Sequence, residues 1–210
     1  MMPFKSISIL SGPSFSNEVS QSLPTAVTLA TKDKKDFDNI SKLIPNKEFR
    51  IYYSNDLIGT QIGGALKNIY AIAAGVAEGL NLGENAKSAL ISRSFAEMTR
   101  YAKKFKADKN TLFGLSGLGD LILTCSSKNS RNTQFGIKLA SSKYDNFLDL
   151  LKSQEVTEGY YTVKAVYNIS QKKNIDMPIM ESVYNILYKQ HDLKEELSNL
   201  LSRPITEEKI

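Results

Sequence analysis

The 210-residue sequence contains only one cysteine and one histidine. A single cysteine, Cys125, excludes an internal disulfide framework, and with only His191 beside it a zinc site is not expected. No apolar run approaches the roughly 20 residues that a membrane-spanning helix needs, and the first residues lack the apolar segment of a secretory signal. These absences favour a cytoplasmic protein with no metal site and no membrane span.

Long blocks of like charge are also absent. The chain has 27 Lys and Arg residues against 22 Asp and Glu, which gives a formal net charge of +5 and a pI of about 9.1. Such a balance attracts polyanions or phosphorylated small molecules, but it is equally compatible with an ordinary solvated surface. Because no basic run reaches the length of a nucleic-acid-binding arm, we expect no nucleic-acid partner.

The first part of the chain carries strand patterns. Residues 7–10, 24–31 and 49–53 are short apolar, β-branched or aromatic runs, and each is typical of a strand. Residues 36–43 fit a short helix that ends before Pro45. About 54 residues are too few for a full sheet. The pattern therefore predicts a small β-containing domain over residues 1–54.

From Ser54 onward the pattern is helical. Ser54, Asn55 and Asp56 supply N-cap chemistry, and apolar residues then recur at helical spacing as far as Leu80. The further helices that we expect cover residues 86–105, 160–173, 178–190 and 193–202, with a mixed loop and short helix over 111–132 and a cap at Ser130. The chain is thus predicted to be mainly α, with a helical domain over residues 55–210.

Lys67 is the first candidate for chemistry. Small residues lie one and two turns from it on the same helical face: Gly63, Gly64, Ala71 and Ala74. Glycines inside a helix are costly, so something must approach the backbone closely. A bound ligand and a packed helix both fit this requirement. If Lys67 is partly desolvated there, its pKa falls toward a value useful for proton transfer, and Asn68 can add an amide donor.

Two further stretches combine backbone freedom with polar groups. Residues 114–120 hold three glycines followed by Asp120, which suits either a ligand-binding loop or a plain turn with a capping aspartate. Residues 124–132 concentrate hydroxyls, amides and Arg131, which suits either phosphate binding or a polar surface loop. A weaker signal is the Gly-Pro turn at residues 11–15, after the first predicted strand. Cys125 is interpreted as a small packed residue.

Together these segments resemble the bacterial NAD(P)-dependent glycerol-3-phosphate dehydrogenases. The matching strings occur in the family's order and cover nearly the whole chain: LSGPSF (10–15), PTAV (24–27), GGALKNIYAIAAG (63–75), EM-x-R (97–100), GLGDLILTCSS (117–127), SRN (130–132), EG (158–159) and MPI (177–179). The GGALKN, GLGDL-x-x-TC and SRN strings, in this order and spacing, are the most specific.

The resemblance implies a fold and an activity. The fold is a helical substrate domain, like the C-terminal domain of 6-phosphogluconate dehydrogenase, preceded by a remnant of a Rossmann domain. The activity is hydride transfer between NADH or NADPH and dihydroxyacetone phosphate, which gives sn-glycerol 3-phosphate for phospholipid synthesis. A homo-oligomer is also expected.

The resemblance also implies roles for particular residues. Lys67 matches the family's acid/base at the C2 oxygen, with Asn68 and Asp120 beside the substrate. The remaining matches are substrate or phosphate contacts at Gly12, Ser14, Ser130, Arg131 and Asn132, and cofactor contacts at Ser16, Arg131, Val156 and Glu158. Ser16 occupies a position that is more usually alanine.

The departures from the family pattern concern the nucleotide. The spacing G-x-G-x-x-G occurs nowhere in the sequence, and the family's second lysine upstream of GPSF is absent. Without that loop, dinucleotide affinity is expected to be poor and a sheet edge to be exposed. Two hypotheses follow: a chain that is inactive alone and works with a separate N-terminal nucleotide-binding chain, or a non-catalytic helical module that oligomerises or binds. A basic module for an anionic partner is a weaker third.

Overall fold

The computed structural model describes residues 6–44, 47–141, 157–204 and 207. The chain folds as two compact units, one of residues 1–64 and 102–123 and one of residues 65–101 and 124–210. Two long helices, α3 (Leu57–Gly79) and α4 (Glu84–Lys104), contribute to both units. The domain boundary expected between residues 54 and 55 stays a prediction, because a compact unit and an inherited domain are different divisions of a chain.

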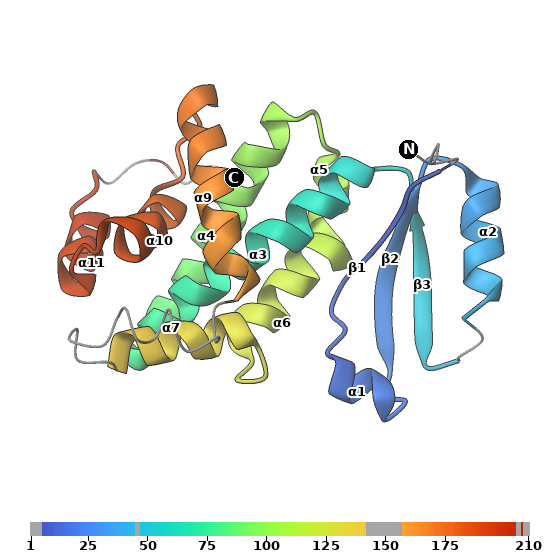
Figure 1. The fold of residues 1–210 in the computed structure, drawn as a ribbon, viewed down its shortest axis with the longest axis horizontal. Coiled ribbons are helices and arrows are strands. Elements are labelled where there is room, and N and C mark those ends of the chain that lie inside the picture. The colour runs from blue at the N-terminus through green and yellow to red at the C-terminus, as the bar shows by residue number, and fades with distance from the viewer. Residues whose placement is uncertain (1–5, 45–46, 142–156, 205–206, 208–210) are drawn as a thin grey trace. The chain divides into compact units, whose positions relative to one another are not determined.

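The first unit combines a small sheet with short helices (Figure 1). Its elements besides the ends of α3 and α4 are β1 (Ser8–Ser11), α1 (Ser16–Ser20), β2 (Thr25–Thr31), α2 (Lys34–Lys42), β3 (Phe49–Ser54), α5 (Lys109–Phe113), η1 (Leu115–Gly119) and the start of α6 (Asp120–Ser126). The three predicted strands and the helix before Pro45 are confirmed. The short helix α1 escaped prediction because it buries none of its residues and so has no apolar period.

The sheet has β2 at its centre. β1 pairs antiparallel with β2, β3 pairs parallel with it, and α2 packs on both β2 and β3 (Figure 1). The five consecutive β2 residues from Val27 to Thr31 are all buried, as expected for a central strand. Within the part of the chain that the structure describes, β1 has a free outer edge, and its Leu10 side chain is 49% exposed. The expected sheet edge is therefore present.

The stretch predicted as a mixed loop and short helix over residues 111–132 does contain a short helix, α6, but most of its remaining residues are helical too. The three glycines at 114, 117 and 119 do not form an open loop but border or lie in η1, a turn of π-helix. A Cβ at Gly117 would overlap the backbone of Leu112, so glycine allows this chain reversal. Asp120 does begin a helix, α6, as predicted.

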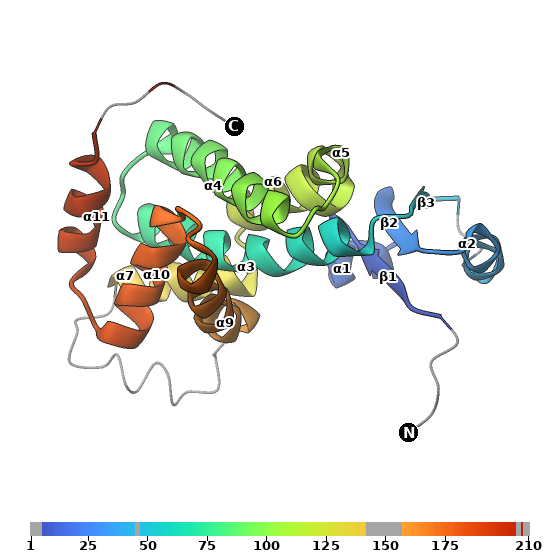
Figure 2. The same ribbon diagram turned by 90° about the horizontal axis from the view of Figure 1, so that it is seen from above.

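The second unit is a layered set of helices (Figure 2). Besides parts of α3, α4 and α6 it contains α7 (Arg131–Ser141), α9 (Glu158–Lys173), α10 (Pro178–Lys189) and α11 (Leu193–Leu201). α10 contacts both α9 and α11. The predicted helices 160–173, 178–190 and 193–202 agree with α9, α10 and α11 to within two residues. α7 begins at Arg131, directly after the predicted cap at Ser130. Cys125 is fully buried, as its interpretation as a packed residue required.

Asp56 and Ser130, both predicted as capping residues, act as caps, and Asp192 caps α11. Asp56 accepts a hydrogen bond from the amide of Gly59 at 2.9 Å, and Ser130 accepts one from the amide of Thr133 at 3.2 Å. Asp192 accepts from the amides of Lys194 and Glu195. Each bond satisfies an amide that the first helical turn leaves without a partner. Among the described residues, no helix is long and apolar enough to cross a membrane.

Candidate active site

Lys67 and Asn68 lie in the middle of α3, and both side chains are half-buried. The small residues before Lys67 do meet a close neighbour. A Cβ at Gly63 would overlap the carbonyl of Ser116 in η1, and one at Gly64 would lie 3.1 Å from the Ser11 hydroxyl oxygen. At these two glycines the approaching group is therefore protein, the packing alternative of the sequence analysis.

A second pair of glycines, Gly75 and Gly136, lies where α3 and α7 cross. A Cβ at Gly75 of α3 would overlap the carbonyl of Thr133, and a Cβ at Gly136 of α7 would overlap the carbonyl of Ile72. The two helices thus cross in backbone contact, which only glycine permits. This crossing brings the first residues of α7, Arg131 and Asn132, to the part of α3 that carries Asn68.

Asn132 joins three helices through one side chain. Its Nδ2 donates to Oδ1 of Asn68 on α3 at 3.0 Å, and its Oδ1 accepts from the amide of Gly159 on α9 at 3.0 Å. Gly159 is tightly enclosed, since a Cβ there would lie 2.6 Å from the carbonyl oxygen of Asn68. Asn132 is only 4% exposed. Its role in this unit is therefore to hold Asn68 and the start of α9 in place.

Arg131 lies beside this network and is paired with Glu158. Its Nη2 donates to Oε1 of Glu158 at 2.5 Å, and the two side chains are 77% and 54% exposed. The structure thus brings together Asn68, Arg131, Asn132 and Glu158 from helices α3, α7 and α9, and Lys67 precedes Asn68 in α3. The Arg131 guanidinium, the two asparagine amides and the Glu158 carboxylate can together recognise a small polar anion.

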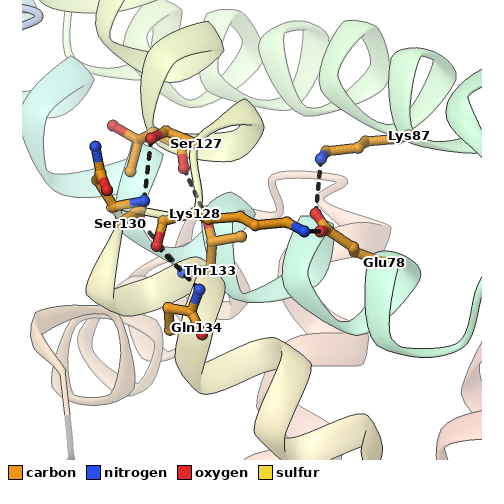
Figure 3. Close-up of polar contacts among 9 residues, drawn as sticks. Glu78, Lys87, Ser127, Lys128, Ser130, Thr133 and Gln134 are labelled. Carbon is orange, nitrogen blue, oxygen red and sulfur yellow. Dashed lines mark hydrogen bonds and ion pairs between the residues drawn. The ribbon is translucent and has the colours of Figure 1, made fainter.

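The turn before α7 is internally hydrogen-bonded rather than an open polar loop (Figure 3). Oγ of Ser127 accepts from the amide of Asn129, Nε2 of Gln134 donates to the carbonyl of Lys128, and Ser130 is buried. Figure 3 also shows two lysines directed at Glu78: Lys87 at 2.8 Å and Lys128 at 3.6 Å. The hydrogen bond from Lys87 holds the pKa of the Glu78 carboxyl below its ordinary value.

Four other predicted site residues belong to the first unit: Gly12, Ser14, Ser16 and Asp120. Gly12 has φ of +147° and its Cβ position is closed by Val27, so this turn requires glycine. Oγ of Ser14 donates to the carbonyl of Gly12 at 3.0 Å, and Ser16 is the first residue of α1. Asp120 is 2% exposed at the start of α6. Val156 lies outside the described residues.

A buried carboxylate in the second unit was missed by the sequence analysis as a feature of its own. Glu97 of α4 is 1% exposed and accepts hydrogen bonds from the amides of Ile179 and Met180 at 2.6 and 3.1 Å, and from the Tyr70 hydroxyl at 3.3 Å. It thereby caps the start of α10 from another helix. Burial raises the pKa of the Glu97 carboxyl to about 7, although the two amides oppose that rise.

Neither of two pockets in the described part of the chain is lined by the predicted site residues. One, of about 60 Å³, is lined mainly by apolar side chains of α3, α10 and α11. The other, of about 420 Å³, lies in the first unit between Tyr52, Tyr53 and Asn110. Within the described part of the chain, no group of three or more acidic, histidine or cysteine side chains could hold a metal ion.

Two protein-family profiles match the chain, one over its C-terminal part and one over its N-terminal part. The profile of the NAD-dependent glycerol-3-phosphate dehydrogenase C-terminus matches residues 56–198, and that of the corresponding N-terminus matches residues 1–37. The chain belongs to the NAD-dependent glycerol-3-phosphate dehydrogenase family. The family resemblance stated from the motifs is therefore confirmed.

Individual relatives agree with this assignment. The chain is 47% identical over 201 residues to the glycerol-3-phosphate dehydrogenase [NAD(P)+] of Solidesulfovibrio magneticus, covering 95% of this chain and 60% of that protein. It is 42% identical to the enzyme of the same name from Francisella tularensis, covering 99% of this chain and 62% of that protein. The chain thus spans about three fifths of the length of these relatives.

Solved structures of the glycerol-3-phosphate dehydrogenase family have the same fold. The enzyme from Coxiella burnetii matches with a TM-score of 0.88 at 38% identity, over 94% of this chain and 61% of that one. The enzyme from Saccharomyces cerevisiae matches with a TM-score of 0.79 at 28% identity, over 92% and 59%. The predicted fold class, a mainly helical domain with a short β-containing part, is confirmed.

Proposed function

We propose that this chain carries the substrate-binding and proton-transfer part of an NAD(P)-dependent glycerol-3-phosphate dehydrogenase. The observation that carries the proposal is the hydrogen-bonded group of Asn68, Asn132 and Gly159, with the Arg131–Glu158 pair beside it and Lys67 next in sequence to Asn68. The substrate is proposed from the family kinship of the chain. The proposed reaction interconverts dihydroxyacetone phosphate and sn-glycerol 3-phosphate, which feeds phospholipid synthesis.

Lys67 is the proposed acid/base. During reduction of the ketone, charge develops on the C2 oxygen of dihydroxyacetone phosphate. The Lys67 ammonium stabilises that oxygen and donates a proton to it, while the C2 carbon receives a hydride; in the reverse direction the Lys67 amine removes the hydroxyl proton. Asn68, fixed through Asn132, orients the substrate oxygen.

The phosphate of the substrate is assigned to Arg131, with Ser130 and Asn132 beside it. A guanidinium offers five N–H donors, and Arg131 uses one amino group on Glu158. Gly12, Ser14 and Asp120 are proposed as further substrate contacts. Their roles rest on the family pattern, as do the cofactor contacts at Ser16, Arg131, Val156 and Glu158.

The proposed site residues do not by themselves account for binding of the whole nicotinamide cofactor. When bound, NADH or NADPH provides the hydride that the C2 carbon receives. Arg131 fits an anionic part of the cofactor, but the sequence contains no G-x-G-x-x-G loop, whose backbone amides cradle a pyrophosphate. We therefore assign pyrophosphate binding to a nucleotide-binding domain outside these 210 residues. The same proposal includes a separate N-terminal nucleotide-binding chain as the source of that domain. It also includes association of copies of this chain.

The experiment measures oxidation of NADH and NADPH that depends on dihydroxyacetone phosphate. The chain is assayed alone and with a separately produced nucleotide-binding domain of a close relative. The proposal predicts no turnover by either part alone and turnover by the mixture. Turnover by the chain alone would contradict the need for the second domain.

An inactive mixture would favour the alternative function, a non-catalytic helical module. A control keeps this outcome informative: the intact relative, assayed in the same buffer, must be active. Binding of the chain to the added domain, followed by size-exclusion chromatography, separates failure to associate from failure to catalyse. Only an associated but inactive mixture would overturn the catalytic proposal.

A further inference from the structure

The larger pocket, of about 420 Å³, is built entirely by the first unit and has no part in the proposed function. Small-molecule sites commonly have volumes of roughly 300 to 1,000 Å³, so this pocket is large enough for a ligand. Its polar lining comes from the sheet on one side and from the start of α5 on the other: Thr28, Tyr52, Ser54, Asp108, Asn110 and Thr111.

The sheet side of the pocket offers an aromatic ring. Thr28 of β2 lies opposite Tyr52 of β3 in the parallel register, and Tyr52 is 47% exposed. Neighbouring residues of a strand point to opposite faces, and the ring of Tyr53 accordingly packs on Phe37 of α2, with ring centroids 5.2 Å apart. Tyr52 therefore supplies the ring on the pocket side of the sheet.

The opposite side of the pocket is held in place by one carboxylate, that of Asp56. Its Oδ2 accepts from the amide of Asp108 at 2.8 Å, and its Oδ1 accepts from the amide of Gly59 at 2.9 Å. The amide of Asp56 in turn donates to Oγ of Ser54 at 3.1 Å. The end of β3 and the starts of α3 and α5 are thus tied together. The pocket is therefore formed before any ligand binds, as is usual for small-molecule sites.

Three polar side chains at the pocket are not used by the protein itself. Within the part of the chain that the structure describes, the Tyr52 hydroxyl, the Asn110 side-chain amide and the Thr111 hydroxyl make no hydrogen bond to another protein group. Hydroxyl and amide groups both donate and accept. These three side chains can therefore pair with the hydroxyl groups of a ligand.

The charges around the pocket favour an uncharged ligand. Among the described residues, no lysine, arginine or histidine lines it, whereas Asp108 contributes a carboxylate that repels anions. The Arg50 guanidinium lies 5.7 Å from the centroid of the Tyr52 ring but is not a lining residue. An aromatic ring beside hydroxyl, amide and carboxylate groups suits a molecule with a carbon face and several hydroxyls.

From these observations we propose that the larger pocket binds a small uncharged polyol. Asn110, Thr111 and the Tyr52 hydroxyl hydrogen-bond its hydroxyl groups, and the Tyr52 ring packs against its carbon skeleton. The pocket shares no residue with the proposed active site, whose substrate carries a phosphate. The polyol is therefore a second ligand of the chain and not its substrate.

The test measures binding of D-glucose, myo-inositol and D-sorbitol to the full 210-residue chain by saturation-transfer NMR. We expect at least one of them to bind saturably, with a Kd of roughly 1 to 10 mM. Asn110→Ala and Tyr52→Phe should each weaken that binding by roughly 3- to 10-fold, because each removes one hydrogen bond. Both side chains are exposed, so both variants should fold like the wild type.

Two matched controls replace exposed residues of α9: Asn168→Ala and Tyr161→Phe, which should bind like the wild type. Absence of saturable binding of all three polyols would overturn the proposal, and so would binding by Asn110→Ala and Tyr52→Phe equal to that of the controls. D-glucose 6-phosphate tests the charge of the ligand. If it bound more tightly than D-glucose and lost that binding in Asn110→Ala, the pocket would be an anion site and the proposal would be wrong.

Discussion

Arg131 and Arg203 provide a matched pair of surface arginines in the second unit. Each donates through Nη2 to a carboxylate, Arg131 to Glu158 at 2.5 Å and Arg203 to Asp176 at 3.0 Å, and all four side chains are at least half exposed. Exposed ion pairs contribute less than about 1 kcal/mol to stability. The two arginines should therefore matter equally little for folding, and only one of them should matter for binding.

Replacement of Arg131 by alanine is expected to lower stability by less than about 1 kcal/mol and to weaken binding of glycerol 3-phosphate by about 10- to 100-fold. The binding loss follows from removal of a charge-assisted hydrogen bond to phosphate. Isothermal titration and urea unfolding measure the two quantities, with Arg203→Ala as the control. Equal affinities of the two variants would remove Arg131 from the proposed site.

Glu97 predicts a pH dependence of stability. Its pKa is about 7 in the folded protein against an ordinary value of 4.5, so between these values the folded state binds a proton that the unfolded state releases. The contribution of this group to stability is therefore present below about pH 4.5 and is lost as the pH rises to 7, by roughly 3 kcal/mol. Urea unfolding at pH 5 and pH 7.5 measures the change.

The control for this prediction is Glu97→Gln, which cannot titrate. The difference between wild type and variant isolates Glu97 from every other group. A variant whose unfolding free energy changes with pH as much as that of the wild type would show that Glu97 does not titrate in this range.

At the scale of residues, the sequence could predict those whose neighbours lie nearby in the chain. Lys67 stood out because small residues one turn away share its face, and Ser130 because it precedes a helix. Glu97 could not stand out, since its partners at Ile179 and Met180 are more than 80 positions away.

At the scale of elements, the crossing of α3 and α7 depends on two glycines. We expect Gly136→Ala to lower stability by about 3 kcal/mol, because the added Cβ overlaps the carbonyl of Ile72 and must separate the helices. Gly119→Ala is the control, since its nearest neighbour would be at 3.7 Å. Thermal unfolding measures both variants. If the Gly136→Ala protein were as stable as the control, α3 and α7 could move apart without loss of stability, and the prediction would be wrong.

Elements with periodic apolar faces and standard caps were predictable, and elements that depend on tertiary closure were not. Each of the helices α3, α10 and α11 has a local physical reason to start: a capping side chain at Asp56 or Asp192 directly before the helix, or Pro178 as its first residue. The π-turn η1 was interpreted as part of a loop, because glycines usually interrupt a helix. Its conformation depends on packing of Gly117 against Leu112, which no local pattern reveals.

At the scale of the whole molecule, the free edge of β1 favours association. Ile7 and Leu10 are 60% and 49% exposed beside unpaired backbone groups. We expect the chain to self-associate with rising concentration, and Leu10→Lys to reduce that association, because a charged edge resists strand pairing. Sedimentation velocity measures this. Leu201→Lys, at an exposed leucine of α11, is the control, and an equal effect of both variants would contradict a specific role for the edge.

The central claim is that Lys67 transfers the proton in a glycerol-3-phosphate dehydrogenase reaction. Its most direct test is the rate of NADH oxidation at saturating dihydroxyacetone phosphate by the Lys67→Met chain, with the nucleotide-binding domain added. The predicted result is a loss of about 10²- to 10⁴-fold relative to the wild type, with Lys172→Met, at an exposed lysine of α9, unchanged. A Lys67→Met rate within twofold of the wild type would contradict the claim.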